Sequence, residues 1–150
     1  MRLEIEKGKI FADLRIGADV AGAVPLKANE GLGHTGVKTH GMGFIVSPSE
    51  AKSLGWGTNT EMDGIFRPFL NGRDLAQISR GTMVIDLFGL SEAEVRQRLP
   101  LVYQLLLDRV KPERDAKASA SADAAQYAKL WWLHGKPRPQ MRPALAGLKR

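Results

Sequence analysis

The side chains with the clearest chemistry in this sequence are the basic residues of its last quarter. The 150 residues carry a formal net charge of +6, and residues 110–150 hold nine basic and three acidic side chains. Residues 1–109 hold thirteen of each sign, so the whole excess lies in the last quarter. A one-signed stretch attracts polyanions such as nucleic acid, although a basic tail also serves solubility alone. Five of these cations are candidate phosphate ligands, because no carboxylate excess offsets them: Lys111, Arg114, Lys136, Arg138 and Arg142.

A second group of candidate DNA contacts surrounds an Asn-Gly turn signal. Arg67 and Arg73 each offer a fork of donors that fits guanine or phosphate, and Asn71 has the amide that pairs with adenine. The alternative is ordinary loop architecture, a turn followed by an Arg–Asp pair. Lys38 and His40, from the glycine-rich stretch before residue 43, complete the predicted DNA-binding set.

Two adjacent tryptophans, Trp131 and Trp132, lie inside the basic stretch. Aromatic rings among Lys and Arg can stack on nucleic-acid bases. A buried indole is the commoner role, so we expect at least one of the two in the core.

Motifs of catalysis and cofactor binding are absent from the sequence. There is no cysteine, no nucleophile-elbow motif and no phosphate-binding loop motif. A G-x-G-x-x-G match spans residues 31–36, but the residues after it predict a strand and a turn where a dinucleotide site needs a helix. The histidines His34, His40 and His134 have no metal-ligand spacing, so hydrogen bonding is their expected role. We expect no metal, no cofactor and no catalytic residue in this chain; a small enzyme using the 31–36 loop is the remaining alternative.

Several elements can be predicted to position these side chains. Strands are expected over 3–16, 43–47 and 82–87. Ser47 and Ser91 each precede a capping box, which predicts a helix from Pro48 to about Gly55 and another over 91–98; a further helix over 100–110 begins at Pro100. Loops are expected over 17–43 and 55–64. The Ala/Ser-rich residues 114–126 predict a frayed helix or disorder, and the prolines after 136 predict an extended end.

The order of several segments resembles one family. These include Gly36-Val-Lys-Thr-His-Gly-Met-Gly-Phe-Ile-Val46, Arg67-Pro-Phe-Leu-Asn-Gly-Arg-Asp-Leu75, Gly81-Thr-Met-Val-Ile-Asp-Leu-Phe-Gly-Leu90 and Trp131-Trp-Leu-His-Gly-Lys-Pro-Arg138. In this order they are similar to MmeI-like restriction-modification enzymes, in which one polypeptide joins an endonuclease, an S-adenosylmethionine-dependent adenine methyltransferase and a target recognition domain. The resemblance runs from about residue 10 to the end and implies the target recognition domain. The glycine-rich cofactor motif and the catalytic motif of the methyltransferase are not in this sequence.

The resemblance and the residues together lead to one set of expectations. We expect an α+β fold with a mixed, mostly antiparallel sheet, a few short helices and long loops, in a single domain over 1–150. The expected function is sequence-specific recognition of double-stranded DNA, with the methyltransferase domain of the same or a companion polypeptide as partner and S-adenosylmethionine bound there. The alternative is a protein-interaction module that docks the methyltransferase without affinity for DNA. No membrane segment is expected, and the expected location is the cytoplasm.

Overall fold

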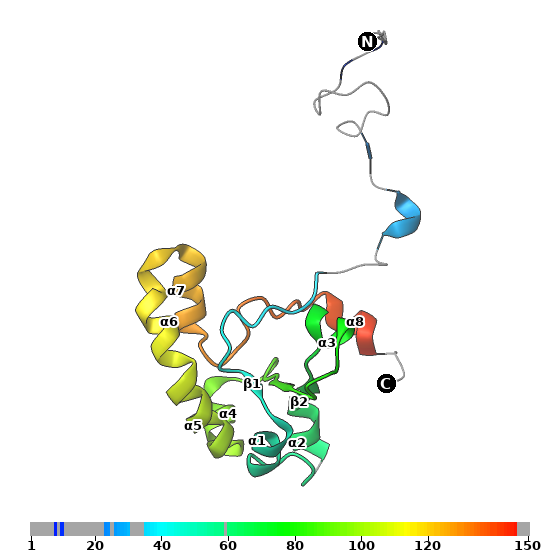
Figure 1. The fold of residues 1–150 in the computed structure, drawn as a ribbon. Helices are drawn as coiled ribbons and strands as arrows, with labels where there is room; N and C mark the ends of the chain where they lie inside the picture. Colours follow the sequence, from blue (N-terminus) through cyan, green and yellow to red (C-terminus); the bar gives the residue numbers. More distant parts are fainter. Residues whose placement is uncertain are drawn as a thin grey trace, which may run out of the picture. The chain divides into compact units, whose positions relative to one another are not determined.

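The computed structural model describes residues 8, 10, 23–24, 26–30, 35–58 and 60–146. The chain divides into two units, Met1–Thr35 and Gly36–Arg150 (Figure 1). The first unit contributes the 3₁₀ turn η1 (Lys27–Asn29). The predicted strand over 3–16 and nearly all of the 31–36 glycine pattern lie outside the described residues. The second unit carries every candidate DNA contact.

A small antiparallel sheet lies at the centre of the second unit. Its strands are β1 (Ile45–Val46), β2 (Phe66–Pro68) and β3 (Met83–Ile85), in the order β1-β3-β2. Ile45 pairs with Val84, and Phe66 pairs with Ile85. The predicted α+β class is confirmed, as are the strands expected within 43–47 and 82–87; β2 was not predicted.

The helices with capping boxes begin where the sequence predicts. In α1 (Pro48–Ser53) and α4 (Glu92–Arg98), the N-cap serine accepts a hydrogen bond from the backbone N–H of the third helical residue, whose carboxylate accepts one in return. Helix α5 (Pro100–Arg109) starts at Pro100, where a proline removes no helical hydrogen bond. Gly55 follows α1 with φ of +107° and ends it.

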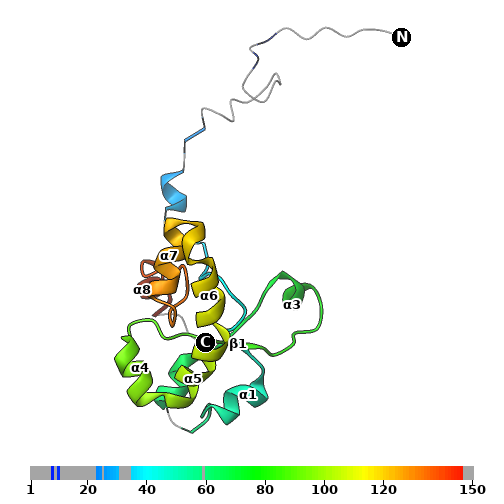
Figure 2. The same cartoon turned by 90° about the vertical axis from the view of Figure 1, so that its left-hand side faces the viewer.

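Two predictions about loops are wrong, and of the two alternatives left open for residues 114–126 the structure has the helix. Residues 55–64 contain α2 (Thr60–Ile65), and the extended end contains α8 (Met141–Ala146), whose Pro143 lies in the first turn. The Ala/Ser-rich stretch folds as α6 (Lys111–Lys117), η2 (Ala118–Ala120) and α7 (Ala122–Lys129). Helices α6 and α7 form a hairpin (Figures 1 and 2). Alanine favours helix, Ser121 caps α7, and Arg114 anchors the hairpin, as described below.

The core lies between the sheet and helices α4 and α5. Phe44, Ile85, Val102 and Leu106 are completely buried there. Trp131 and Trp132 also belong to this core, with only 3% and 9% of their surfaces exposed. The prediction that at least one tryptophan is buried is therefore confirmed, and neither ring is available for stacking on a base.

Helix α3 (Gly72–Ala76) lies in the connection between β2 and β3. We call residues 69–82 the β2–β3 loop. In Figure 2 this loop extends away from the helices around the core.

Candidate nucleic-acid interface

Two segments far apart in the sequence pair to form a short ribbon. The backbone N–H groups of Lys38 and Lys136 each donate to the other residue's carbonyl, at 3.2 and 3.0 Å, and Gly135 N–H donates to the Thr39 carbonyl at 3.2 Å. We call residues 38–39 and 135–136, two segments of this one polypeptide, the two-chain ribbon. Directly opposed residues of an antiparallel pair direct their side chains to the same face, so the ribbon brings two predicted cations together.

His40 continues this basic cluster. Its backbone has φ of +50°, and its ring centroid lies 4.8 Å from that of Tyr127. Partial burial, followed by the charges of Lys136, Lys38 and Arg114, lowers the pKa of His40 below its usual value. A side chain at position 135 would clash with this ring, because a Cβ built on Gly135 lies 2.7 Å from His40 Cδ2. The close approach of ribbon and imidazole therefore requires glycine.

The two lysines of the ribbon differ in whether a carboxylate compensates their charge. Lys136 Nζ lies 2.7 Å from Asp123 Oδ2, in a pair whose side chains are both solvent-exposed. Such surface pairs contribute little and can exchange partners. Lys38 is exposed and makes no ion pair within the described part of the chain.

Arg114 lacks the solvent exposure that a phosphate ligand needs, because its side chain is buried with 5% exposure. Its Nη2 donates to the Thr39 carbonyl at 2.8 Å. Its Nη1 lies within hydrogen-bonding distance of four carbonyls, at the end of α7 and just beyond: Tyr127, Leu130, Trp131 and Leu133. Burial lowers the pKa of Arg114 to about 10. The structure therefore corrects the expectation: Arg114 ties the helical hairpin to the ribbon and cannot reach a phosphate from this position.

Arg142 is likewise engaged inside the protein. Its Nη1 and Nη2 lie 2.8 and 3.0 Å from the two carboxylate oxygens of Asp86, and its guanidinium lies 4.0 Å from the Phe88 ring centroid. Burial raises the pKa of Asp86, but the hydrogen bonds and charge of Arg142 outweigh it, so the pKa lies below its usual value. A bidentate, largely buried pair of this kind holds its arginine in place.

Lys111 and Arg138 complete the basic segment. Lys111 pairs with Asp115 one helical turn later, at 2.5 Å. The expectation that no carboxylate offsets the five cations is thus wrong for Lys111, Lys136 and Arg142. Arg138 is half-buried with φ of +52°, its Nε has no hydrogen-bond partner, and it forms no ion pair with any residue that the structure describes.

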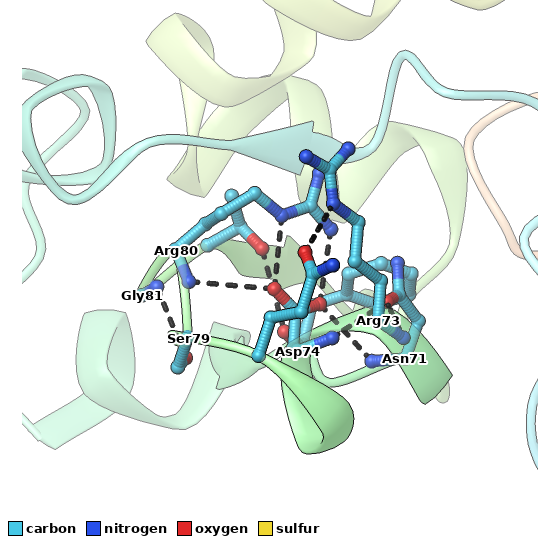
Figure 3. Close-up of polar contacts among 9 residues, drawn as sticks. Asn71, Arg73, Asp74, Ser79, Arg80 and Gly81 are labelled. Atoms are coloured by element: carbon cyan, nitrogen blue, oxygen red, sulfur yellow. Dashed lines mark hydrogen bonds and ion pairs between the residues drawn. The ribbon is translucent and has the colours of Figure 1, made fainter.

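The Asn-Gly signal marks a helix start and not a turn alone. Asn71 Oδ1 accepts hydrogen bonds from the backbone N–H groups of Arg73 and Asp74, at 3.0 and 3.1 Å (Figure 3). The amide oxygen that would accept from adenine is therefore occupied, which corrects the adenine-binding role predicted for Asn71. Arg73 stays exposed, and its Nε donates to Gln77 Oε1 at 3.1 Å.

The prediction missed an ion pair that closes the β2–β3 loop. Asp74 Oδ1 and Oδ2 each lie 2.9 Å from Arg80, at Nε and Nη2, and the Asp74 side chain is only 1% exposed (Figure 3). Asp74 also accepts from the backbone N–H groups of Asn71 and Arg80. The hydrogen bonds of Arg80 hold the pKa of this carboxyl well below its usual range. The capping box Asn71-x-x-Asp74 could have revealed the start of α3 and the role of Asp74 there, but not the pairing of Asp74 with Arg80.

Arg67 and Arg142 line a cavity of about 730 Å³ together with His134. His134 is buried, and its Nε2 donates to the Ile85 carbonyl at 2.8 Å, which bears out hydrogen bonding as its role. Burial lowers the pKa of His134, against the opposing effects of Asp86 and of the Ile85 hydrogen bond. This cavity gathers two predicted contacts, but Arg142 is committed to Asp86.

The part of the chain that the structure describes contains neither a metal site nor a membrane-spanning helix. No three His, Asp or Glu side chains gather there as a metal site. No helix found there is long and apolar enough to span a bilayer. Comparisons with protein-family models, curated proteins and solved structures give no match.

Seven of the ten predicted contacts thus form three groups, and Lys111, Arg114 and Arg138 lie outside them. Lys38, His40 and Lys136 meet at the two-chain ribbon, Arg67 and Arg142 meet at the cavity, and Asn71 and Arg73 lie on the β2–β3 loop.

Proposed function

We propose that this chain binds double-stranded DNA as the target recognition domain of an S-adenosylmethionine-dependent adenine methyltransferase of restriction-modification type. The methyltransferase domain would hold the cofactor and flip the adenine out of the stack, while this chain sets the register on the duplex. The resemblance of the segments between residues 36 and 138 supports the family. The observation that best supports DNA binding is the opposition of Lys38 and Lys136 in the two-chain ribbon.

Like charges directly opposite one another destabilise an antiparallel pair. Asp123 offsets Lys136 only through an exposed pair, and Lys38 has no carboxylate partner among the described residues. A phosphate between the two lysines would relieve this repulsion, and Lys136 can exchange the exposed Asp123 for it. His40, beside them, would gain a proton near a phosphate.

The engaged cations set the size of the expected phosphate contact. Arg114 and Arg142 are engaged inside the protein, and Lys111 lies outside the ribbon in an exposed pair on α6, which leaves the two ribbon lysines and Arg138 as the main phosphate ligands. About three phosphate contacts give a slope of about −3 for the logarithm of the binding constant against the logarithm of salt concentration.

The experiment is duplex binding by the full chain, measured by fluorescence anisotropy over a salt series. Lys38→Gln should weaken binding to all sequences alike and reduce the magnitude of the slope by about one. Lys52→Gln is the matched control, since Lys52 on α1 is exposed and outside the ribbon. Binding that does not respond to salt, or equal loss in both variants, would overturn the proposal.

A protein-interaction module is the second candidate, and exposed apolar side chains favour it. Leu75 and Ile78 of the β2–β3 loop expose 76% and 92% of their surfaces. Apolar groups gathered on one exposed element are typical of protein interfaces. Capture of the methyltransferase domain after nuclease treatment, lost in Leu75→Ser/Ile78→Ser, would support this candidate; capture unaffected by the variant would contradict it.

A further inference from the structure

We infer that the β2–β3 loop is the element that recognises bases, and that Arg73 is its specificity-determining residue. This inference rests on the proposed function and assigns base recognition to an element separate from the two-chain ribbon. The reasons are the internal fixation of the loop, the donors it exposes and its projection from the core.

The loop is held in one conformation by its own residues. Asp74 closes it through the bidentate pair with Arg80, and Asn71 caps α3 while its own N–H donates to Asp74 (Figure 3). The carboxylate at the centre of this network is nearly inaccessible to solvent. A loop fixed before binding loses little conformational entropy in a complex, which favours selective recognition.

This network also determines which groups remain for a ligand. Arg80 neutralises the one acidic side chain of the loop, so the remaining charge is that of Arg73. Gln77 orients Arg73 through Nε, and both Nη groups stay without a hydrogen-bond partner in the described part of the chain. The free Nη fork of an exposed arginine matches O6 and N7 of guanine in the major groove.

The other exposed side chains of the loop fit the same surface. Leu75 and Ile78 can contact the methyl group of thymine, and the Gln77 amide nitrogen is a further donor. The loop carries a single short helix and extends away from the core in Figure 2. The major groove, about 12 Å wide, admits one helix.

The test is selection of binding sites from a random duplex library by the full wild-type chain, followed by affinity measurements on the selected duplex. We expect a consensus that contains guanine. Arg73→Lys keeps the charge but removes the fork, so it should reduce discrimination at that base pair about tenfold or more. Its salt slope should equal that of the wild type. Arg96→Lys, at an exposed position of α4, is the matched control and should keep the consensus.

Fixation of the loop is tested separately. Asp74→Asn retains an oxygen for Arg80 but loses the charge, and it should broaden the selected consensus while circular dichroism shows the fold retained. An unchanged consensus in this variant would contradict the role of the clamp.

The outcomes separate the two proposals. If the wild-type chain binds no duplex at low salt, the proposed function fails. If it binds with a salt slope of about −3 but selects no consensus, or if Arg73→Lys keeps the wild-type consensus, the inference about the loop fails alone. Loss of methyltransferase capture in Leu75→Ser/Ile78→Ser with an unchanged consensus would assign the loop to protein docking and overturn the inference.

Discussion

Position in the fold, more than charge, decides what each basic side chain of this protein can do. Arg114 and Lys38 carry the same formal charge; Lys38 belongs to the two-chain ribbon and Arg114 contacts it. Arg114 is buried among backbone carbonyls, where it stabilises the protein, whereas Lys38 faces solvent. Exposed charge that is not internally compensated is what a polyanion can use.

Replacement of Arg114 tests the structural role directly. Arg114→Met removes the guanidinium hydrogen bonds to five carbonyl oxygens, of which only those of Thr39 and Leu130 accept a further backbone hydrogen bond within the described part of the chain. Unpaired buried polar groups reduce stability, and we expect the free energy of unfolding to fall by about 2–4 kcal/mol. Urea denaturation followed by tryptophan fluorescence measures it.

Arg96→Met provides the control for this measurement. Arg96 is exposed, and its loss should change the free energy of unfolding by no more than about 0.5 kcal/mol. Equal stability of the two variants would show that the buried guanidinium is dispensable.

At the scale of elements, local sequence signals predicted the starts of helices, whereas structure that depends on long-range contacts could not be predicted. The starts of α1, α4 and α5 follow from Ser47, Ser91 and Pro100, because a cap or an initial proline acts within one turn. The α6–α7 hairpin could not be predicted in this way. Its anchor is Arg114, whose acceptors lie as far away as Thr39, 75 positions earlier.

The contact between the start of β1 and the end of α5 gives a test at this scale. A Cβ at Gly43 would lie 2.7 Å from Val110 Cγ2 and 3.1 Å from Arg109 Cβ. Gly43→Ala therefore forces the strand and the helix apart, and we expect a loss of about 2 kcal/mol in the free energy of unfolding, measured in urea.

Gly36→Ala is the matched substitution, since no atom lies within 4 Å of the Cβ it would add. Thermal unfolding of this variant should coincide with that of the wild type. A similar effect at both positions would mean that the spacing of β1 and α5 is not constrained by Gly43.

At the scale of the whole molecule, the distribution of charge along the chain was an incomplete guide to the interface. The count for residues 110–150 is correct, but Asp86 comes from the neutral part of the sequence and engages Arg142. The same limitation applies to Lys38 and Lys136, which are 98 positions apart and adjacent in the fold. Which cations are compensated and which are adjacent depends on tertiary structure, so the sequence predicts the presence of a basic surface better than its members.

The two described histidines make the stability of the whole protein depend on pH. Burial lowers the pKa of His134, and burial with neighbouring cations lowers that of His40. The unfolded chain therefore binds more protons than the folded protein as pH falls through about 6.5, so the free energy of unfolding decreases on acidification. Urea midpoints should be lower at pH 5.5 than at pH 7.5.

Two variants test whether the histidines cause this pH dependence of stability. His134→Gln keeps a donor for the Ile85 carbonyl, and His40→Gln keeps a polar side chain beside Tyr127. Each should reduce the difference between the two midpoints. A difference that persists unchanged in the double variant would exclude the histidines as its source.

The geometry of the two-chain ribbon has a mechanical consequence. The two segments of the ribbon run antiparallel. The chain therefore enters at residue 38 and leaves at residue 136 at the same end of the ribbon. Once Arg142 has parted from Asp86, tension applied along the polypeptide would load the three backbone hydrogen bonds one after another, as in opening a zipper, and not all together as in shear. The ribbon would then open and separate Lys38 from Lys136 while the sheet stayed intact, so stretching would release a bound polyanion before it opened the sheet.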